Sequence, residues 1–250
     1  MVRLHYFKHL ALIAGLTFAS ASSASAGTLQ IDLDIGIDTF SILDNGSFDT
    51  DLTPNVIVVD VSQFNGFIAG FGYTDLTFKS LSANSNNPGA NSGASIKINS
   101  DAVAALNAAV QFTLTTFQTG FIIPTGIGNL ASSAGGSWTQ TDTNDSATFQ
   151  SAFQNTLFTT KPTSVSPDTG GFTASYNSSS PLLPLGIVTA PFSLWNQTTI
   201  TISSTADLEA ENQFTGTTVL RAVAIPEPSS VIMMLSAVPA VMALRRFRGR

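Results

Sequence analysis

Hydrophobic and polar residues alternate with a period of two along much of this chain. In the segment 29–37 every second residue is aliphatic, and the residues between are polar or glycine. Successive side chains of a strand point to opposite faces, so the segment predicts a strand with one buried face. Seven further segments, rich in Val, Ile, Thr and Phe, also predict strands: 55–61, 74–81, 94–98, 110–117, 171–176, 194–203 and 215–224.

Segments rich in Gly, Asn, Ser and Pro separate these strands, most clearly at 82–93 and 161–171. One helix is predicted over 101–109 (DAVAALNAA), with Ser100 as its N-cap. Several strands with loop-rich connections and few helix signals predict an all-β fold. The expected architecture is a single antiparallel β-sandwich or jelly roll.

The first 26 residues have the organisation of a signal peptide. A positive n-region, an apolar h-region and a small-residue cleavage site follow one another: Arg3 and Lys8, residues 10–18, and Ala24, Ala26 and Gly27. The apolar core is too short to span a bilayer, so we expect signal peptidase to cleave before Gly27. The alternative is a retained N-terminal anchor.

The opposite end of the chain, 225–250, combines a proline-rich motif, an apolar run and a basic terminus. Residues 231–244 carry no charge, and with the two preceding serines they would form a helix of roughly 24 Å, short for a bilayer core. The aliphatic stems of the following arginines can extend that span. These arginines also predict a cytoplasmic C-terminus: Arg245, Arg246, Arg248 and Arg250. The alternatives are a plain tail anchor and a buried core helix.

The motif Pro226-Glu227-Pro228, the apolar run and the arginine cluster resemble the PEP-CTERM sorting domain of Gram-negative bacteria. In that family exosortase, an integral membrane cysteine protease/transpeptidase, processes the exported protein at this signal. The resemblance implies transient anchoring in the inner membrane, followed by a place at the cell surface or in the extracellular matrix. The organisms concerned make exopolysaccharide, so the resemblance also implies a role in the biofilm matrix.

The resemblance divides the chain into a signal peptide (1–26), an exported β-rich domain (27–224) and a sorting domain (225–250). Within the sorting domain it implies a transmembrane helix at about 229–244. Two residues depart from the usual family pattern: Ile225, where Val is common, and Pro239 inside the helix. Both positions stay apolar, and proline is tolerated in a membrane helix, so the resemblance holds.

The predicted exported domain is acidic and lacks both histidine and cysteine. Residues 27–225 hold thirteen Asp and two Glu against three Lys and one Arg, a net charge of −11. Such an exterior argues against nucleic acid and anionic membrane surfaces as partners. Both histidines, His5 and His9, belong to the signal peptide. The domain therefore cannot form a Ser-His-Asp triad, a Cys-His pair or a zinc site of the usual type.

Two groups of residues are candidates for ligand binding. Asp32, Asp34 and Asp38 could hold Ca²⁺, although the ligand order of an EF-hand is not met; the alternative is a solvated acidic face that blocks edge pairing. Trp138 lies in a polar Gly/Thr segment, where it could contact a sugar or pack beneath a loop. Trp195 follows an apolar segment and is expected in the core.

We therefore expect a non-catalytic exported surface or matrix protein that acts with exopolysaccharide and needs no cofactor. The alternative is an extracellular carbohydrate-active enzyme with a carboxylate pair, because aspartate is plentiful. Two carboxylates about 5 Å or 6.5–9.5 Å apart in a cleft beside Trp138 would favour the enzyme. Acidic residues scattered over a convex surface would oppose it.

Overall fold

The structure, a computed structural model, describes residues 27–140, 145–154, 156–158, 173–205 and 209–223. The predicted signal peptide (1–26) and the predicted sorting domain (225–250) lie outside these ranges. Within the described ranges, no helix has both the length and the apolar character needed to cross a membrane.

Thirteen strands and one helix form in the described part of the chain. The strands are β1 (Leu29–Ile35), β2 (Asp38–Leu43), β3 (Val56–Val58), β4 (Leu76–Ser85), β5 (Ala94–Ala104), β6 (Ala109–Phe121), β7 (Gly126–Thr139), β8 (Ser146–Phe153), β9 (Thr156–Phe158), β10 (Thr173–Ser179), β11 (Leu183–Val188), β12 (Phe192–Ser203) and β13 (Ala210–Ala222); the helix is α1 (Val61–Ala69). The prediction of an all-β fold is confirmed.

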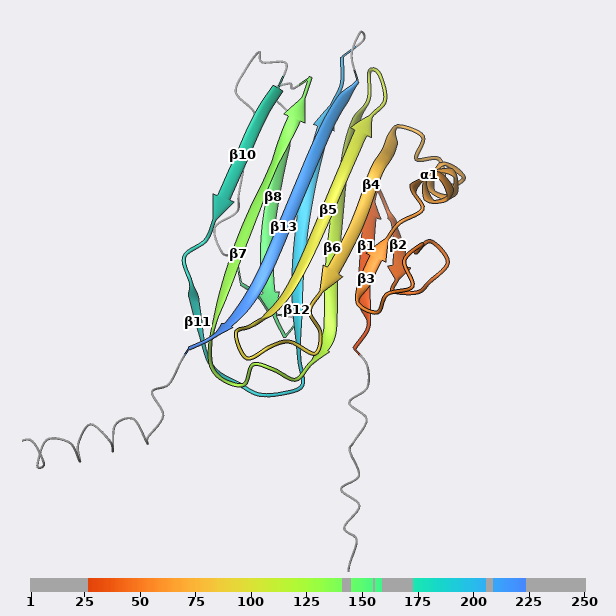
Figure 1. Cartoon of the computed structure of the whole chain (residues 1–250). Coiled ribbons are helices and arrows are strands. Elements are labelled where there is room, and N and C mark those ends of the chain that lie inside the picture. Colours follow the sequence, from red (N-terminus) through yellow and green to blue (C-terminus); the bar gives the residue numbers. More distant parts are fainter. Residues whose placement is uncertain (1–26, 141–144, 155, 159–172, 206–208, 224–250) are drawn as a thin grey trace, which may run out of the picture.

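The strands make two antiparallel sheets that lie face to face as a sandwich (Figure 1). The six-stranded sheet has the order β2-β1-β6-β12-β8-β9. The seven-stranded sheet has the order β10-β7-β13-β5-β4-β3, and β11 also pairs with β7. Strand β1 starts and β13 finishes at the same end of the sandwich (Figure 1).

The predicted helix at 101–109 is wrong. Strand β5 continues to Ala104, and β6 already begins at Ala109. Pairing with β4 on one side and β13 on the other fixes Asp101–Ala104 as strand, since Ala104 is in register with both Leu76 and Ala210. Tertiary pairing therefore overrides the helix preference of the alanine-rich sequence.

The observed helix, α1, follows the predicted strand 55–61 and overlaps it only at Val61. Asp60 caps its N-terminus, accepting a hydrogen bond from the Gln63 backbone N–H at 3.1 Å. Phe64 and Ile68 are four residues apart and fully buried, so one face of the helix packs on the sandwich. Only β3 of the predicted strand survives, at the edge of the seven-stranded sheet.

Candidate ligand-binding groove

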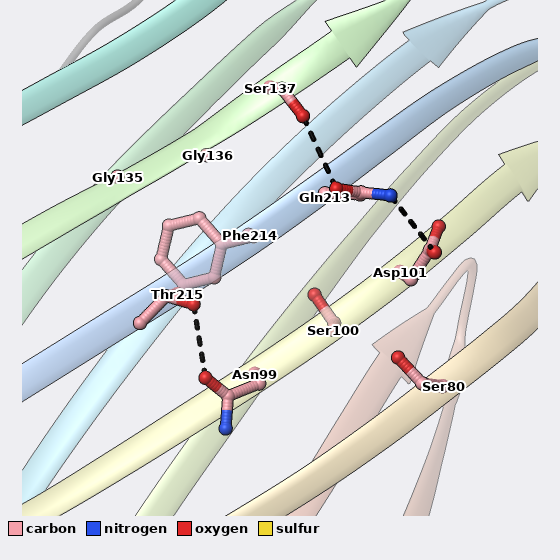
Figure 2. Close-up of a pocket in the computed structure, with 10 residues that line it drawn as sticks. All are labelled: Ser80, Asn99, Ser100, Asp101, Gly135, Gly136, Ser137, Gln213, Phe214 and Thr215. Atoms are coloured by element: carbon pink, nitrogen blue, oxygen red, sulfur yellow. Dashed lines mark hydrogen bonds between the residues drawn. The ribbon is translucent and has the colours of Figure 1, made fainter.

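A groove of about 440 Å³ crosses β4, β5, β13 and β7 on the seven-stranded sheet (Figure 2). Most residues around it carry short hydroxyl, amide or carboxyl side chains, or none: Ser80, Asn99, Ser100, Asp101, Gly135, Gly136, Ser137, Gln213, Phe214 and Thr215. Small-molecule sites have comparable volumes but are usually lined by apolar groups. The groove is therefore suited to a polar ligand.

Strand register explains why residues far apart in sequence meet here. Asp101 on β5 is opposite Ser80 on β4 and Gln213 on β13, and Gln213 is opposite Ser137 on β7. Because side chains alternate between the faces of a strand, this row shares the solvent side of the sheet. A second row runs parallel to it, with Thr215 between Asn99 and Gly135.

Hydrogen bonds link neighbouring side chains along both rows (Figure 2). Ser137 Oγ donates to Gln213 Oε1 at 3.4 Å, and Gln213 Nε2 donates to Asp101 Oδ2 at 3.4 Å. In the second row Thr215 Oγ1 donates to Asn99 Oδ1 at 3.0 Å. The two contacts of Gln213 exceed the usual length of N–H···O and O–H···O bonds, so a ligand can replace them at little cost.

A charged cluster lies at one end of the groove. Lys79 Nζ forms an ion pair of 2.5 Å with Glu211 Oε2. Gln213 Nε2 donates to Glu211 Oε1 at 3.3 Å as well as to Asp101 Oδ2. Burial, followed by the charge of Glu211, raises the pKa of Asp101 to about 6. Burial acts in the same direction on Glu211, but the hydrogen bonds from Lys79 and Asp101 outweigh it and lower the pKa of Glu211.

The side-chain amide of Gln213 bridges the two carboxyl groups. Its Nε2 donates to Glu211 Oε1 at 3.3 Å and to Asp101 Oδ2 at 3.4 Å, and Asp101 Oδ1 is buried without a hydrogen bond from an amide or hydroxyl group. In glycosidases the two carboxyl groups flank the scissile bond, with space between them for the sugar or a water molecule. In this groove the amide of Gln213 bonds to both carboxyl groups instead.

Replacement of Asp101 by asparagine is expected to flatten the dependence of stability on pH. The folded pKa of Asp101 exceeds the value of 3.8 for a free aspartate, so the stability contributed by its protonated form is lost as pH rises through about 6. Asp101→Asn keeps the shape of the side chain and an acceptor for Gln213 Nε2, and it has no proton to lose. In chemical unfolding between pH 4 and pH 7.5, the free energy of unfolding of the variant should increase relative to that of the wild type as pH rises. Asp75 is exposed, and Asp75→Asn is the control: its free energy of unfolding should change with pH as that of the wild type does.

The structure places both tryptophans on strands. Trp138 is on β7, not in a loop, and is fully buried at 0% exposure, so its ring cannot contact a sugar. It is one of the alternate residues of β7 whose side chains point into the sandwich. The expectation of a sugar contact at Trp138 is therefore wrong, and its side chain packs in the core of the sandwich, not beneath a loop. Trp195, expected in the core, is only partly buried and stacks on Phe117 with ring centroids 4.6 Å apart.

The three calcium candidates are not brought together. Asp32 accepts hydrogen bonds from Gln30 and Ser41 at 2.6 Å each, and Asp34 accepts one from Thr39 at 2.5 Å. Asp38 begins the next strand and accepts a bond from the Tyr73 hydroxyl at 2.7 Å, which contributes most to the raised pKa of Tyr73. Across the described ranges, no three acidic, histidine or cysteine side chains cluster closely enough to hold a metal ion. The solvated polar face describes these aspartates better than a calcium site.

No protein-family model matches the chain, and no curated protein sequence does. Two solved structures show a loose likeness. The carbohydrate-binding module TmCBM61, determined with β-1,4-galactotriose, has 11% identity over 60% of this chain and 84% of the module, with a TM-score of 0.23. A structure of the Gx strain of infectious bursal disease virus has 10% identity over 81% of this chain and 52% of that chain, with a TM-score of 0.24. Superpositions this loose locate no site on this chain.

Proposed function

We propose that this chain is a non-catalytic exported protein of the cell surface or extracellular matrix. It is sorted by exosortase through its C-terminal signal, and the groove of the seven-stranded sheet binds a hydroxyl-rich polysaccharide. The observation that carries the proposal is the polar groove that register assembles from four strands.

The lining of the groove supports a polyhydroxyl ligand. Asn99 and Gln213 each offer an amide donor and an acceptor, and Ser137 and Thr215 offer hydroxyl groups that do both. A polysaccharide presents the same mixture of donors and acceptors at every residue. The acidic net charge of the exported domain favours a neutral or cation-bridged polysaccharide over a strongly anionic one.

The charged cluster supports a binding role over catalysis. Lys79 pairs with Glu211, and the amide of Gln213 bonds to the carboxyl groups of both Glu211 and Asp101, so both carboxyl groups have partners within the protein. A general acid and a nucleophile in a glycosidase would instead face the two sides of a scissile bond. We therefore propose that the groove binds its ligand without hydrolysing it.

The course of the chain supports surface display. Strand β13 finishes at the end of the sandwich where β1 starts (Figure 1). Glu211 is the second residue of β13, and Asp101 precedes the end of β5 by three residues, so the charged cluster lies toward the opposite end. With a membrane helix after β13, that opposite end would point away from the membrane.

The test of this proposal replaces Pro226, Glu227 and Pro228 together by alanine in a Gram-negative host that contains exosortase. Fractionation and intact mass of the full chain are compared with those of the wild type. The wild type is expected to lose its C-terminal tail and reach the surface or matrix. The variant should keep its tail and accumulate in the inner membrane, because the processing enzyme no longer recognises it.

Ser179→Ala, a change in an exposed side chain of β10, is the matched control and should be processed like the wild type. Sorting by this signal is refuted if the triple variant and the wild type have the same C-terminal mass and the same location. Loss of processing in a host without exosortase would assign the step to that enzyme.

A further inference from the structure

A belt of buried polar residues divides the interior of the sandwich into two hydrophobic clusters. One cluster contains Phe149 and Ile200, and the other contains Phe153 and Leu194. Between them, β6, β7, β8, β12 and β13 each place polar side chains on the inner face. The members of the belt, all less than 9% exposed, are Thr116, Gln118, Ser132, Ser151, Asn196, Thr198 and Thr218.

Several members of this belt have hydrogen-bond partners, and three of the bonds join the sheets. Thr218 Oγ1 donates to the Trp195 carbonyl at 3.2 Å, linking β13 to β12. Ser151 Oγ and Thr218 Oγ1 are 2.7 Å apart, linking β8 to β13. Ser85 Oγ donates to Gln118 Oε1 at 2.9 Å, linking β4 to β6. Thr198 Oγ1 donates to the Thr148 carbonyl within one sheet. These hydrogen bonds therefore offset the free-energy cost of burying the hydroxyl and amide groups.

Asn196 and Thr116 are different. Asn196 is 0% exposed, and neither its Nδ2 nor its Oδ1 has a hydrogen-bond partner among protein groups. Thr116, also 0% exposed, has an unpaired Oγ1 and lies directly opposite Asn196 in the pairing of β6 with β12. Three unpaired polar atoms on two facing residues would cost far more free energy than a native core normally tolerates.

We propose that Asn196 and Thr116 bind at least one internal water molecule between the two sheets. The water accepts a hydrogen bond from Asn196 Nδ2 and donates one to Thr116 Oγ1, which satisfies a donor and an acceptor at once. Buried waters typically make about three bonds to groups that would otherwise be unpaired. The polar belt then contains a buried water site, which extends the hydrogen-bond network that includes Ser151 and Thr218.

Nuclear magnetic resonance on the ¹⁵N-labelled full chain tests this site directly. The side-chain amide signals of Asn196, identified by their loss in Asn196→Leu, are expected to show cross-relaxation with a long-lived water. Absence of that signal, with the amide protons protected from exchange, would overturn the proposal. It would mean that Asn196 bonds directly to a protein group or is dry.

Thermal unfolding of the full chain gives an independent test. Thr116→Val removes the hydroxyl and keeps the shape, so it should lower Tm by about 2–4 °C in the wild type. In an Asn196→Leu background, where the water has lost its other anchor, the same change should leave Tm unchanged or raise it. A rise in Tm in both backgrounds would show that the hydroxyl is unpaired and would overturn the proposal.

The control is Thr113→Val on the same strand. Its hydroxyl lies on the outer face and bonds to Thr199 Oγ1 at 2.9 Å, so its effect should not depend on Asn196. If Asn196→Leu does not fold, Asn196→Ala replaces it in both experiments. Coupling between Thr116 and Asn196 without a water signal would indicate a direct bond and count against the proposal.

Discussion

Replacement of Trp138 by alanine is expected to lower the free energy of unfolding by about 3–5 kcal/mol, as for other large aromatic side chains in a core. Trp138 is the largest fully buried side chain, and its ring lies 6.1 Å from that of Tyr176. Deletion leaves a void between the sheets that rigid strands on both sides cannot close. Denaturant unfolding of the full chain at pH 7 measures the loss, with an unchanged m-value as the sign of an intact fold.

Trp138→Phe is the matched variant for this prediction. It keeps most of the ring volume and removes the indole Nε1, which is buried without a hydrogen-bond partner. It should therefore cost much less than the alanine change. If Trp138→Ala instead left stability intact and abolished polysaccharide binding, the ring would be a ligand contact and its placement in the core would be refuted.

Strands were predictable where the alternation of side chains was regular. The segment 29–37 and the segment 194–203 correspond to β1 and β12, in which buried and partly exposed residues alternate as the sequence pattern predicts. All the inward residues of β1 are aliphatic, whereas β12 also turns Asn196 and Thr198 inward. In these strands the sequence itself encodes which face is buried. The sandwich could be predicted because such segments recur with loops between them.

Elements that depend on distant partners were not predictable. Strand β7 has seven Gly or Ser residues among its fourteen, a composition typical of a loop, yet it is held between β13 and the β10–β11 edge. The alanines at the end of β5 favour a helix locally but pair with two strands. In both cases long-range pairing supplies the stabilisation that local sequence does not.

The groove could not be predicted for the same reason. Asp101 and Glu211 are far apart in sequence, and only the register of β5 with β13 makes them neighbours. One signal was present: Glu211 is one of two glutamates in the predicted exported domain, and it stands four residues before the predicted strand 215–224. A lone carboxylate in a strand is a weak signal without knowledge of the strand beside it.

Two neighbouring glycines of β7 are expected to have opposite roles. Gly136 faces inward: a Cβ there would lie 1.9 Å from the Gln213 carbonyl and 2.6 Å from the Tyr176 hydroxyl. Gly135 faces the groove, and its added Cβ would meet the Tyr176 carbonyl at 3.3 Å, which a small shift relieves. Gly136→Ala should therefore damage the fold, whereas Gly135→Val should fill the groove.

Gly136→Ala is expected to lower the free energy of unfolding by about 3 kcal/mol or more, because the backbone of β13 must move away to admit the methyl group. The corresponding fall in Tm is about 6–12 °C for a domain of this size. Gly66→Ala serves as the control, since no atom lies within 4 Å of its added Cβ and alanine favours helix α1. Loss of stability in the control as well would indicate a general intolerance of substitution.

Gly135→Val should cost less than about 1 kcal/mol, since valine suits a strand and the strain is small. It should nevertheless weaken binding to the matrix polysaccharide more than tenfold, because its side chain occupies the space beside Thr215 and Asn99 where a ligand would lie. Co-sedimentation of the folded full chain with polysaccharide from the producing strain measures this. Unchanged binding by Gly135→Val would refute the groove as the ligand site. It would say nothing against the sorting signal, so polysaccharide binding and sorting by exosortase are tested independently of each other.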